Sequence, residues 1–215
     1  SLFLRENMSK VSIVIATLNE EENIQELLTN IKQAIHDDYE ILVVDDSSTD
    51  ETAKIAKAEG ANVIRHPYKI GNGAAIKTGI RNAKGDILIL MDGDGQHNPA
   101  DIPRLLEYID RYDMVVGART KDSLSFFSRR LANKIYNLFA SYVTGFKIED
   151  LTCGFRAVKR NVATRFLYLL PNTFSYPTTI TLAFLKAGRS IKYVPVKTLE
   201  RKGKSKIQPL HDGIR

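Results

Sequence analysis

The chain has 215 residues, of which 43% are hydrophobic and 26% charged, and this balance excludes a disordered or low-complexity protein. A single cysteine, Cys153, excludes an internal disulfide framework, so we expect a reducing, cytosolic environment. The length suits one α/β domain. Residues 1–10 lack the apolar core of a signal peptide, and we expect them to be a disordered or tag-like N-terminus.

The net charge of +6 is distributed unevenly along the chain. Residues 1–110 hold 11 Lys and Arg against 19 Asp and Glu, whereas residues 111–215 hold 20 against 6. An acidic half suits cations and sugar hydroxyls, and a basic half suits phosphates, nucleic acid or an anionic membrane. No nucleic-acid recognition motif accompanies the basic half, so we expect no nucleic-acid partner.

Apolar runs alternate with helical periodicities from residue 11 to residue 117. They predict strands at residues 11–16, 41–44, 61–65, 87–91 and 113–117. The segments between them predict helices that begin near Asn19, Ser48, Gly71 and Asn98. Asn19 with Glu22, and Ser48 with Glu51, have the spacing of helix-capping residues. The alternation predicts a mostly parallel sheet flanked by helices, with right-handed crossovers.

The pattern changes after residue 120. Five apolar residues between 131 and 142 share one face of a predicted amphipathic helix. Residues 166–185 carry no charge over a length that could span a bilayer, but two prolines and four threonines favour a helix, a turn and a second helix. A strand at residues 191–196 then precedes a basic loop at residues 201–206.

The most specific chemical pattern is the pair of carboxylates that follows the apolar run at residues 87–91. Asp92 and Asp94 form a DxD motif whose two side chains point the same way in an extended segment. Two carboxylates so close repel one another unless a cation lies between them, and hard oxygen ligands suit Mg²⁺ or Mn²⁺ that carries a phosphate. For this motif alone, a surface turn rich in Asp and Gly is the alternative.

Polar residues also follow the first two predicted strands, at residues 17–20 and at residues 45–46. The carboxyl ends of parallel strands lie on one edge of a sheet, where ligands bind in the crevice. We therefore expect residues 17–20, 45–46 and 92–94 to meet at one ligand-binding edge.

In this order the motifs resemble the inverting glycosyltransferases of family 2, and among them the dolichyl-phosphate mannose synthase-like enzymes that glycosylate polyprenyl phosphates. The resemblance covers about residues 10–213 and rests on LNEEENI at 18–24, VDDSSTD at 44–50, GNGAA at 71–75, MDGDGQHNP at 91–99, GAR at 117–119, DLTCGFR at 150–156 and GKSK at 203–206. It implies a GT-A fold, a Rossmann-like single α/β domain with a mostly parallel central sheet. The domain would span residues 11–215, with a nucleotide- and metal-binding half at 11–117 and a basic acceptor-binding half at 118–215.

The resemblance also implies roles for individual residues. The nucleotide would be bound by Thr17, Leu18, Glu20, Asp45, Asp46, Gly71 and Asp92. The metal ligands would be Asp92, Asp94 and Gln96. Donor or acceptor phosphate would be bound by Arg119, Arg129, Arg130, Asn133, Arg156, Arg201, Ser205 and Lys206. The catalytic residues would be Asp94, Asp150 and Arg119.

Three positions depart from the family pattern, and one of them is Arg201, which lies two rather than three residues before Gly203. Residues 16–19 read ATLN where mannose synthases commonly carry Pro and Tyr, which leaves both GDP-mannose and UDP-glucose open as donors. Cys153 stands where Ser is usual, and we expect it to pack in the core rather than to react.

The expected chemistry follows from charge. The nucleotide diphosphate gains charge as it leaves, and a divalent cation with Arg or Lys groups stabilises that charge. A phosphate monoester acceptor is already largely ionised at neutral pH and needs no general base, whereas a saccharide hydroxyl needs a carboxylate such as Asp150. We expect transfer of mannose or glucose to polyprenyl or dolichyl phosphate. A saccharide acceptor and a metal-dependent nucleotidyltransferase are the alternatives.

Membrane association is predicted from the acceptor and from charge. Residues 186–206 hold eight Lys or Arg and one acid, Glu200. Such a segment is attracted to anionic lipid by about 1 kcal/mol for each basic residue near the surface. We therefore expect a peripheral protein on the cytoplasmic face of a membrane.

Overall fold

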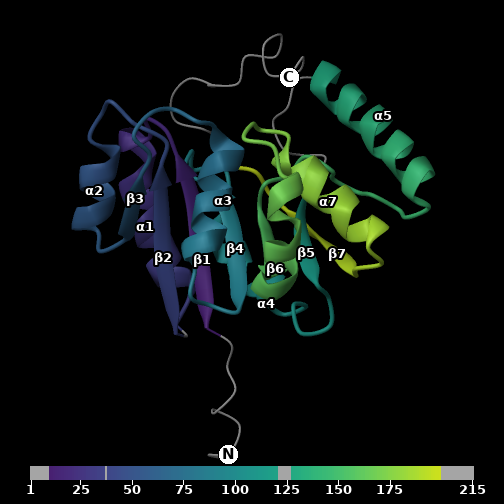
Figure 1. Cartoon of the computed structure of the whole chain (residues 1–215), viewed down its shortest axis with the longest axis horizontal. Helices are drawn as coiled ribbons and strands as arrows, with labels where there is room; N and C mark the ends of the chain where they lie inside the picture. The colour runs from purple at the N-terminus through teal and green to yellow at the C-terminus, as the bar shows by residue number, and fades with distance from the viewer. Residues whose placement is uncertain (1–9, 37, 121–126, 200–215) are drawn as a thin grey trace, which may run out of the picture.

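The computed structural model describes residues 10–36, 38–120 and 127–199, apart from the side chains of residues 127–134. Its strands form one sheet in the order β3-β2-β1-β4-β6-β5-β7 (Figure 1). They are β1 (Val11–Thr17), β2 (Tyr39–Asp45), β3 (Asn62–Arg65), β4 (Ile87–Asp92), β5 (Met114–Arg119), β6 (Arg156–Lys159) and β7 (Ile191–Val196).

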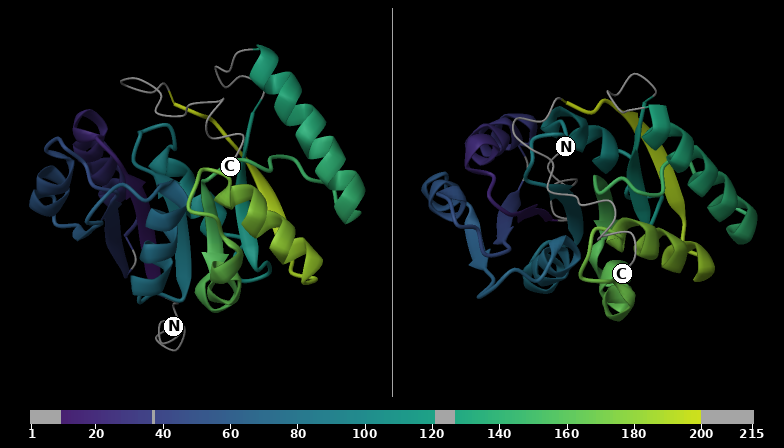
Figure 2. Two further views of the ribbon diagram at one scale, coloured as in Figure 1. Left: turned by 45° about the horizontal axis from the view of Figure 1, so that its top comes forward. Right: turned by 90° about the horizontal axis from the view of Figure 1, so that it is seen from above.

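Helices cover both faces of this sheet. The α-helices are α1 (Glu21–Ala34), α2 (Thr52–Ala58), α3 (Asn72–Asn82), α4 (Ile102–Leu106), α5 (Phe127–Thr144), α6 (Arg160–Ala163) and α7 (Tyr176–Lys186), and the 3₁₀ helices are η1 (Pro99–Asp101) and η2 (Thr164–Leu169). Helices α1 and α4 lie on one face, and α3 and α7 lie on the other (Figure 2). Every side chain of β1 is therefore buried, as the uninterrupted apolar runs predict.

Most neighbouring strands are parallel. Strand β1 pairs with β2 and with β4 in parallel, β2 pairs with β3 in parallel, and β5 pairs with β7 in parallel. The predicted α/β fold class is confirmed. The exception is β6, which runs antiparallel to both β4 and β5 and lies between them.

The predicted helix-capping residues are wrong. Helix α1 begins at Glu21, whose N–H donates to the Asp50 carboxylate at 3.2 Å; Asn19 instead has a left-handed backbone, with φ of 52°. Ser48 donates its hydroxyl to the carboxylate of Asp45 rather than capping α2. The Ser48 hydroxyl also accepts the Asn19 N–H at 2.8 Å, and the Asn19 side chain accepts the Thr49 N–H at 2.7 Å, so contacts between these two loops override the local capping signal.

The uncharged stretch at residues 166–185 forms two short helices, as predicted. The first is η2, and after a turn the second is α7. Within residues 10–36, 38–120 and 127–199, no helix combines the length and the hydrophobicity that a bilayer crossing requires.

Helix α5 stands apart from the sheet (Figures 1 and 2). It packs against α7 through a small second core of Ala140, Ile148, Leu151 and Leu185. The rest of its described surface does not join the main core, which is built from the sheet and the helices on its two faces.

Candidate active site

The three polar strand ends meet at one edge of the sheet, as predicted. Thr17 at the end of β1 pairs with Asp45 of β2, and Ala16 pairs with Asp92 of β4. The backbone continues this pairing past the strands, because Asp46 N–H donates to the Thr17 carbonyl and Gly93 N–H donates to the Ala16 carbonyl, each at 2.9 Å. The loops that follow β1, β2 and β4 therefore remain hydrogen-bonded side by side at this edge.

Asp92 is held on several sides. Its Oδ1 accepts a hydrogen bond from the Asn72 amide at 2.9 Å, and its backbone N–H donates to Nδ1 of His97 at 3.3 Å. A Cβ at Gly154 would lie only 3.2 Å from Asp92 Oδ2, so the absence of a side chain there leaves room for the carboxylate. Asp94 follows in the same loop, where its Oδ1 accepts the N–H of Gln96 at 3.1 Å.

The donor set of this loop fits a hard divalent cation. Asp92 and Asp94 are half-buried carboxylates within one turn, and Gln96 adds an amide oxygen. Among the described residues, no three or more His, Cys, Asp and Glu side chains form a group that could hold a metal ion by themselves. A cation here would take one or two carboxylates and complete its shell with phosphate oxygens and water, which is how Mg²⁺ is usually bound next to nucleotides.

The predicted nucleotide-binding residues lie along the same edge, and several of them are engaged within the protein. Glu20 is buried and accepts a hydrogen bond from the Asn23 amide at 2.8 Å. Thr17 is buried and donates to the Val44 carbonyl at 3.4 Å, while Leu18 is half-buried. Asp45 is fully buried and accepts from the backbone and hydroxyl of Ser48.

Asp46 fastens the loop that leads into α3. Its two carboxylate oxygens accept the backbone N–H groups of Ile70 and Gly71 at 2.9 and 2.8 Å. The buried ring of His66 joins it through Nδ1 at 2.8 Å, and Nε2 of the same ring lies 2.9 Å from the Thr78 hydroxyl. Asp46 thus fixes the backbone at Ile70 and Gly71. These hydrogen bonds were not predicted from the sequence.

Arg119 and Asp150 form a two-pronged ion pair next to the DxD loop. Nε and Nη2 of Arg119 donate to the two carboxylate oxygens of Asp150 at 2.8 and 2.9 Å, and Nη2 also donates to the Thr152 hydroxyl at 2.6 Å. Asp150 further accepts the backbone N–H groups of Arg119, Thr152 and Cys153. Burial by itself would raise the pKa of Asp150, but the hydrogen bonds and charge of Arg119 outweigh it and hold that pKa below its usual value.

Arg156 departs from the expectation that it touches a phosphate. Its side chain is fully buried, and its guanidinium donates to the carbonyls of Cys153 and Pro177 and to the Thr181 hydroxyl. These bonds tie the loop before β6 to α7. A role as a direct phosphate ligand is therefore wrong for this conformation, and we assign Arg156 to the support of the loop that faces Asp92.

Six of the expected phosphate-binding side chains lie outside the described part of the structure. The helix that carries Arg129, Arg130 and Asn133 is present as α5, but the side chains of these three lie outside the described residues. Arg201, Ser205 and Lys206 also lie outside them. The segment that precedes them runs beside the DxD loop, because Leu199 N–H donates to the Gln96 carbonyl at 2.9 Å and His97 pairs with Thr198 as an isolated antiparallel bridge.

His66, Asn72 and His97 are the residues of this edge that sequence reasoning missed. Asn72 and His97 lie inside the motifs at 71–75 and 91–99, so their place in those motifs was a usable signal. His97 stacks on Phe155 with ring centroids 5.1 Å apart, which joins the DxD loop to the loop before β6. His66 follows β3 with no motif around it.

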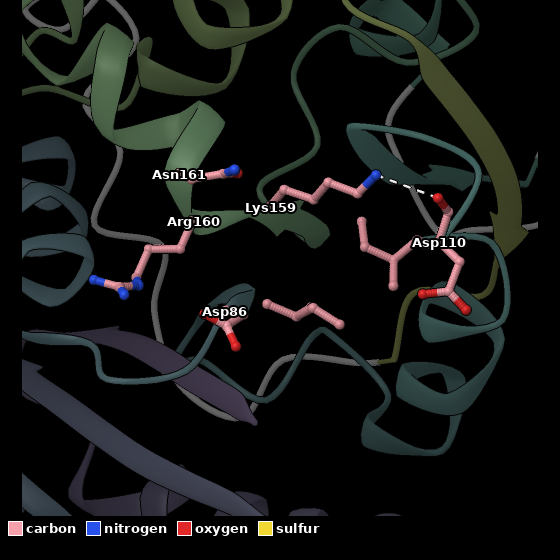
Figure 3. Close-up of a pocket in the computed structure, with 7 residues that line it drawn as sticks. Asp86, Asp110, Lys159, Arg160 and Asn161 are labelled. Carbon is pink, nitrogen blue, oxygen red and sulfur yellow. Dashed lines mark hydrogen bonds between the residues drawn. The ribbon is translucent and has the colours of Figure 1, made fainter. Parts of the chain in front are cut away.

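A cavity of about 250 Å³ lies at the opposite edge of the sheet. It is lined by Asp86, Ile87, Ile109, Asp110, Lys159, Arg160 and Asn161, at the start of β4 and the end of β6 (Figure 3). Lys159 closes one side by donating to the Asp110 carbonyl at 3.3 Å. The whole length of β4 separates this cavity from Asp92, so it is not part of the candidate site.

Comparison with known sequences identifies relatives across most of the chain. A family model described as glycosyl transferase family 2 matches residues 12–167. An uncharacterized protein of Methanocaldococcus jannaschii is 33% identical over 203 residues, which cover 90% of this chain and 83% of that protein. The undecaprenyl-phosphate 4-deoxy-4-formamido-L-arabinose transferase of Pseudomonas fluorescens is 33% identical over 220 residues, which cover 93% of this chain and 61% of that enzyme. The chain thus spans about three fifths of the length of the latter relative.

Solved structures share the same architecture. Glucosyl-3-phosphoglycerate synthase from Mycobacterium tuberculosis in complex with phosphoglyceric acid has a TM-score of 0.72 at 20% identity, and the match covers 92% of this chain and 73% of that one. The same enzyme with Mn²⁺ and UDP-glucose has a TM-score of 0.73 at 21% identity, with the same coverage. At this identity the likeness establishes the fold, which agrees with the sheet described above.

Proposed function

The chain belongs to glycosyl transferase family 2, and we propose that within this family it transfers a hexose from a nucleotide-diphosphate sugar to the phosphate of a polyprenyl lipid. The relatives named as undecaprenyl-phosphate transferases use an acceptor of this kind, and the fold relatives bind UDP-glucose and Mn²⁺. Membership in a family of glycosyltransferases removes the nucleotidyltransferase alternative.

The observation that carries this proposal is the ion pair of Asp150 with Arg119, which lowers the pKa of Asp150. A saccharide hydroxyl must lose a proton as it attacks, and Asp150 is the carboxylate beside Arg119 that we considered for this task. Its lowered pKa and its bidentate pairing make it a poor base. A phosphate monoester is already largely ionised near neutral pH and needs no proton acceptor. The site therefore favours a phosphate nucleophile over a hydroxyl.

The proposed step is a direct displacement with inversion. An oxygen of the acceptor phosphate forms a bond to the anomeric carbon while the bond from that carbon to the nucleotide diphosphate breaks, and its electron pair leaves with the diphosphate. Asp92, Asp94 and Gln96 would hold Mg²⁺ or Mn²⁺, which neutralises charge on the departing diphosphate. Arg119, whose side chain is about one third exposed beside this loop, would contact a phosphate.

Helix α5 supports membrane attachment. Among its described side chains and those just after it, seven large apolar ones are exposed: Ile135, Tyr136, Leu138, Phe139, Tyr142, Val143 and Phe146. Residues 135–144 contain no charged side chain, whereas Arg129, Arg130 and Lys134 precede them in the same helix. An apolar face next to basic residues is typical of helices that lie in a lipid interface. We propose that α5 and the basic segment 186–206 bring the site to the cytoplasmic surface of a membrane.

A transfer assay tests donor and acceptor together. The chain would be incubated with radiolabelled UDP-glucose or GDP-mannose and with undecaprenyl phosphate, dolichyl phosphate or 3-phosphoglycerate, with and without Mn²⁺. We expect metal-dependent label in the organic-extractable lipid from one donor. Label in 3-phosphoglycerate alone would replace the lipid by a small phosphorylated acceptor. Failure to bind either nucleotide would overturn the enzyme assignment.

A further inference from the structure

We propose that Asn72 is a positioning residue that holds the Asp92 carboxylate in the orientation in which it receives a divalent cation. This inference rests on the proposed function, because it takes Asp92 as a ligand of the cation and diphosphate. The proposed role of Asn72 is in metal binding, and it is separate from recognition of the nucleotide base and of the acceptor.

The contact is a direct one between side chains. Nδ2 of Asn72 donates to Oδ1 of Asp92 at 2.9 Å. The second oxygen, Oδ2, lies against Gly154, where an added Cβ would be 3.2 Å away. The carboxylate is therefore confined between an amide donor on one oxygen and a close-packed backbone near the other. Both residues are half-buried, so water competes less for this bond than at an exposed site.

Asn72 is a well-positioned donor because several contacts hold the start of α3. Gly71 N–H donates to Asp46, and Ala74 N–H donates to the Asn172 carbonyl at 3.3 Å. An added Cβ at Gly71 would lie 2.1 Å from the Asn172 carbonyl oxygen, and one at Gly73 would lie 2.2 Å from the Pro171 carbonyl oxygen. Lys77 of α3 also contacts the loop before α7, because it donates to the Leu170 carbonyl at 2.8 Å.

Asn72 also belongs to the loop that Asp46 fastens. One end of the loop is bonded to the carboxylate after β2, and the other end presents its amide to the carboxylate after β4. The two strand ends are thus joined through residues 70–72 as well as through β1. A neutral amide satisfies one oxygen of Asp92 without neutralising its charge, so attraction for a cation is kept while the freedom of the side chain is reduced.

The consequence is a measurable effect on metal affinity. Partners of this kind, which orient a ligand without touching the metal, typically change metal affinity by about 10- to 100-fold when they are removed. Leu branches at the same carbon as Asn but has no donor, so Asn72→Leu deletes the hydrogen bond and replaces the amide by a somewhat larger apolar group. Asn82→Leu is the matched control, because Asn82 ends the same helix and its amide donates to the Thr78 carbonyl of its own turn.

The test titrates Mn²⁺ into the metal-free chain in the presence of UDP and follows free Mn²⁺ by electron paramagnetic resonance. We expect the Mn²⁺ dissociation constant to rise about tenfold in Asn72→Leu and to stay unchanged in Asn82→Leu, with equal thermal unfolding midpoints. Asn72→Gln, which keeps an amide, should recover part of the affinity. If Asn72→Leu does not fold, Asn72→Ser takes its place in the same titration.

Two outcomes would overturn the inference, and they are distinguishable. Wild-type affinity in a folded Asn72→Leu or Asn72→Ser would show that Asn72 does not position Asp92, while the proposed function would stand. Absence of Mn²⁺ binding by the wild-type chain, with UDP present, would remove the proposed metal site itself and the inference with it.

Discussion

The edge of the sheet at β1, β2 and β4 differs from the surface of α5 in the contacts that its side chains make. The side chains at the edge are hydrogen-bonded within the protein, whereas those on α5 are apolar and exposed. At the edge, Asp46 and Asp92 accept hydrogen bonds from neighbouring loops before any ligand arrives. On α5, large apolar side chains such as Leu138 and Tyr142 are 71% and 87% exposed. An edge whose carboxylates are already held in place suits the binding of a small charged ligand. An exposed apolar surface suits contact with lipid. The comparison therefore separates the proposed donor-binding region from the proposed membrane-binding region.

The largest effect expected on the donor region comes from Asp94→Asn. Loss of one of two carboxylates for the cation should lower sugar transfer about a thousandfold, since a bound metal contributes several kcal/mol to such a transition state. The measurement is the initial rate of lipid labelling at saturating donor. Asp86→Asn, at the cavity on the opposite edge of the sheet, is the control and should retain activity. Equal losses in both variants would contradict the location of the site.

Asp150→Asn should destabilise the protein in a pH-dependent manner. Breaking the pair should cost about 2–3 kcal/mol at pH 7, less than for a fully buried pair because Arg119 is about one third exposed. Because the pKa of Asp150 is lowered by folding, its contribution is present above the ordinary Asp value of about 4 and is lost as pH falls through the lower folded value. Urea unfolding of both proteins at pH 7, 5 and 3 measures this. A difference that grew toward acid pH would contradict the ion pair.

Gly73→Ala probes the close contact between α3 and the loop before α7. Ala would favour the helix by about 1 kcal/mol. The new Cβ would however meet the Pro171 carbonyl oxygen, so we expect a net loss of about 1–2 kcal/mol in the free energy of unfolding. Gly60→Ala is the comparison, because its added Cβ meets nothing within 4 Å and it reports only the cost of its positive φ of 81°. A stabilised Gly73→Ala would mean that the loop moves aside freely.

The smallest effect is expected on α5, and it should spare the donor region. Leu138→Gln should weaken binding to anionic vesicles about fivefold, as loss of about 1 kcal/mol of apolar burial implies. Nucleotide binding and unfolding should not change, because Leu138 is 71% exposed. Leu169→Gln on η2 is the matched control, and co-sedimentation with vesicles is the measurement. Equal weakening by both would remove α5 as the membrane-binding element.

The sequence predicts the strands well because both faces of the sheet are covered. Long apolar runs such as residues 87–91 have no solvent-facing side, so their strand character is visible without tertiary information. The convergence of residues 17–20, 45–46 and 92–94 at one edge follows from the parallel order, and the register of β1 with β2 and β4 confirms it.

Strand β6 could not be predicted in the same way. It has four residues, RAVK, with a basic residue at each end, and it exists because β4 and β5 offer it two antiparallel partners. The burial of Arg156 follows from this pairing, so its expected role as a phosphate ligand failed for the same reason. Ser48 likewise bonds to Asp45, three residues earlier, instead of capping α2.

The most direct measurement of the central claim uses a matched pair of acceptors. Undecaprenyl phosphate and undecaprenol differ only in the phosphate, and both would be offered to the enzyme with the donor that supports transfer. We predict label on undecaprenyl phosphate, none on undecaprenol, and an inverted anomeric configuration in the product. Label on undecaprenol that is lost in Asp150→Asn would contradict the account, because it would require the general base that the Arg119–Asp150 pair argues against.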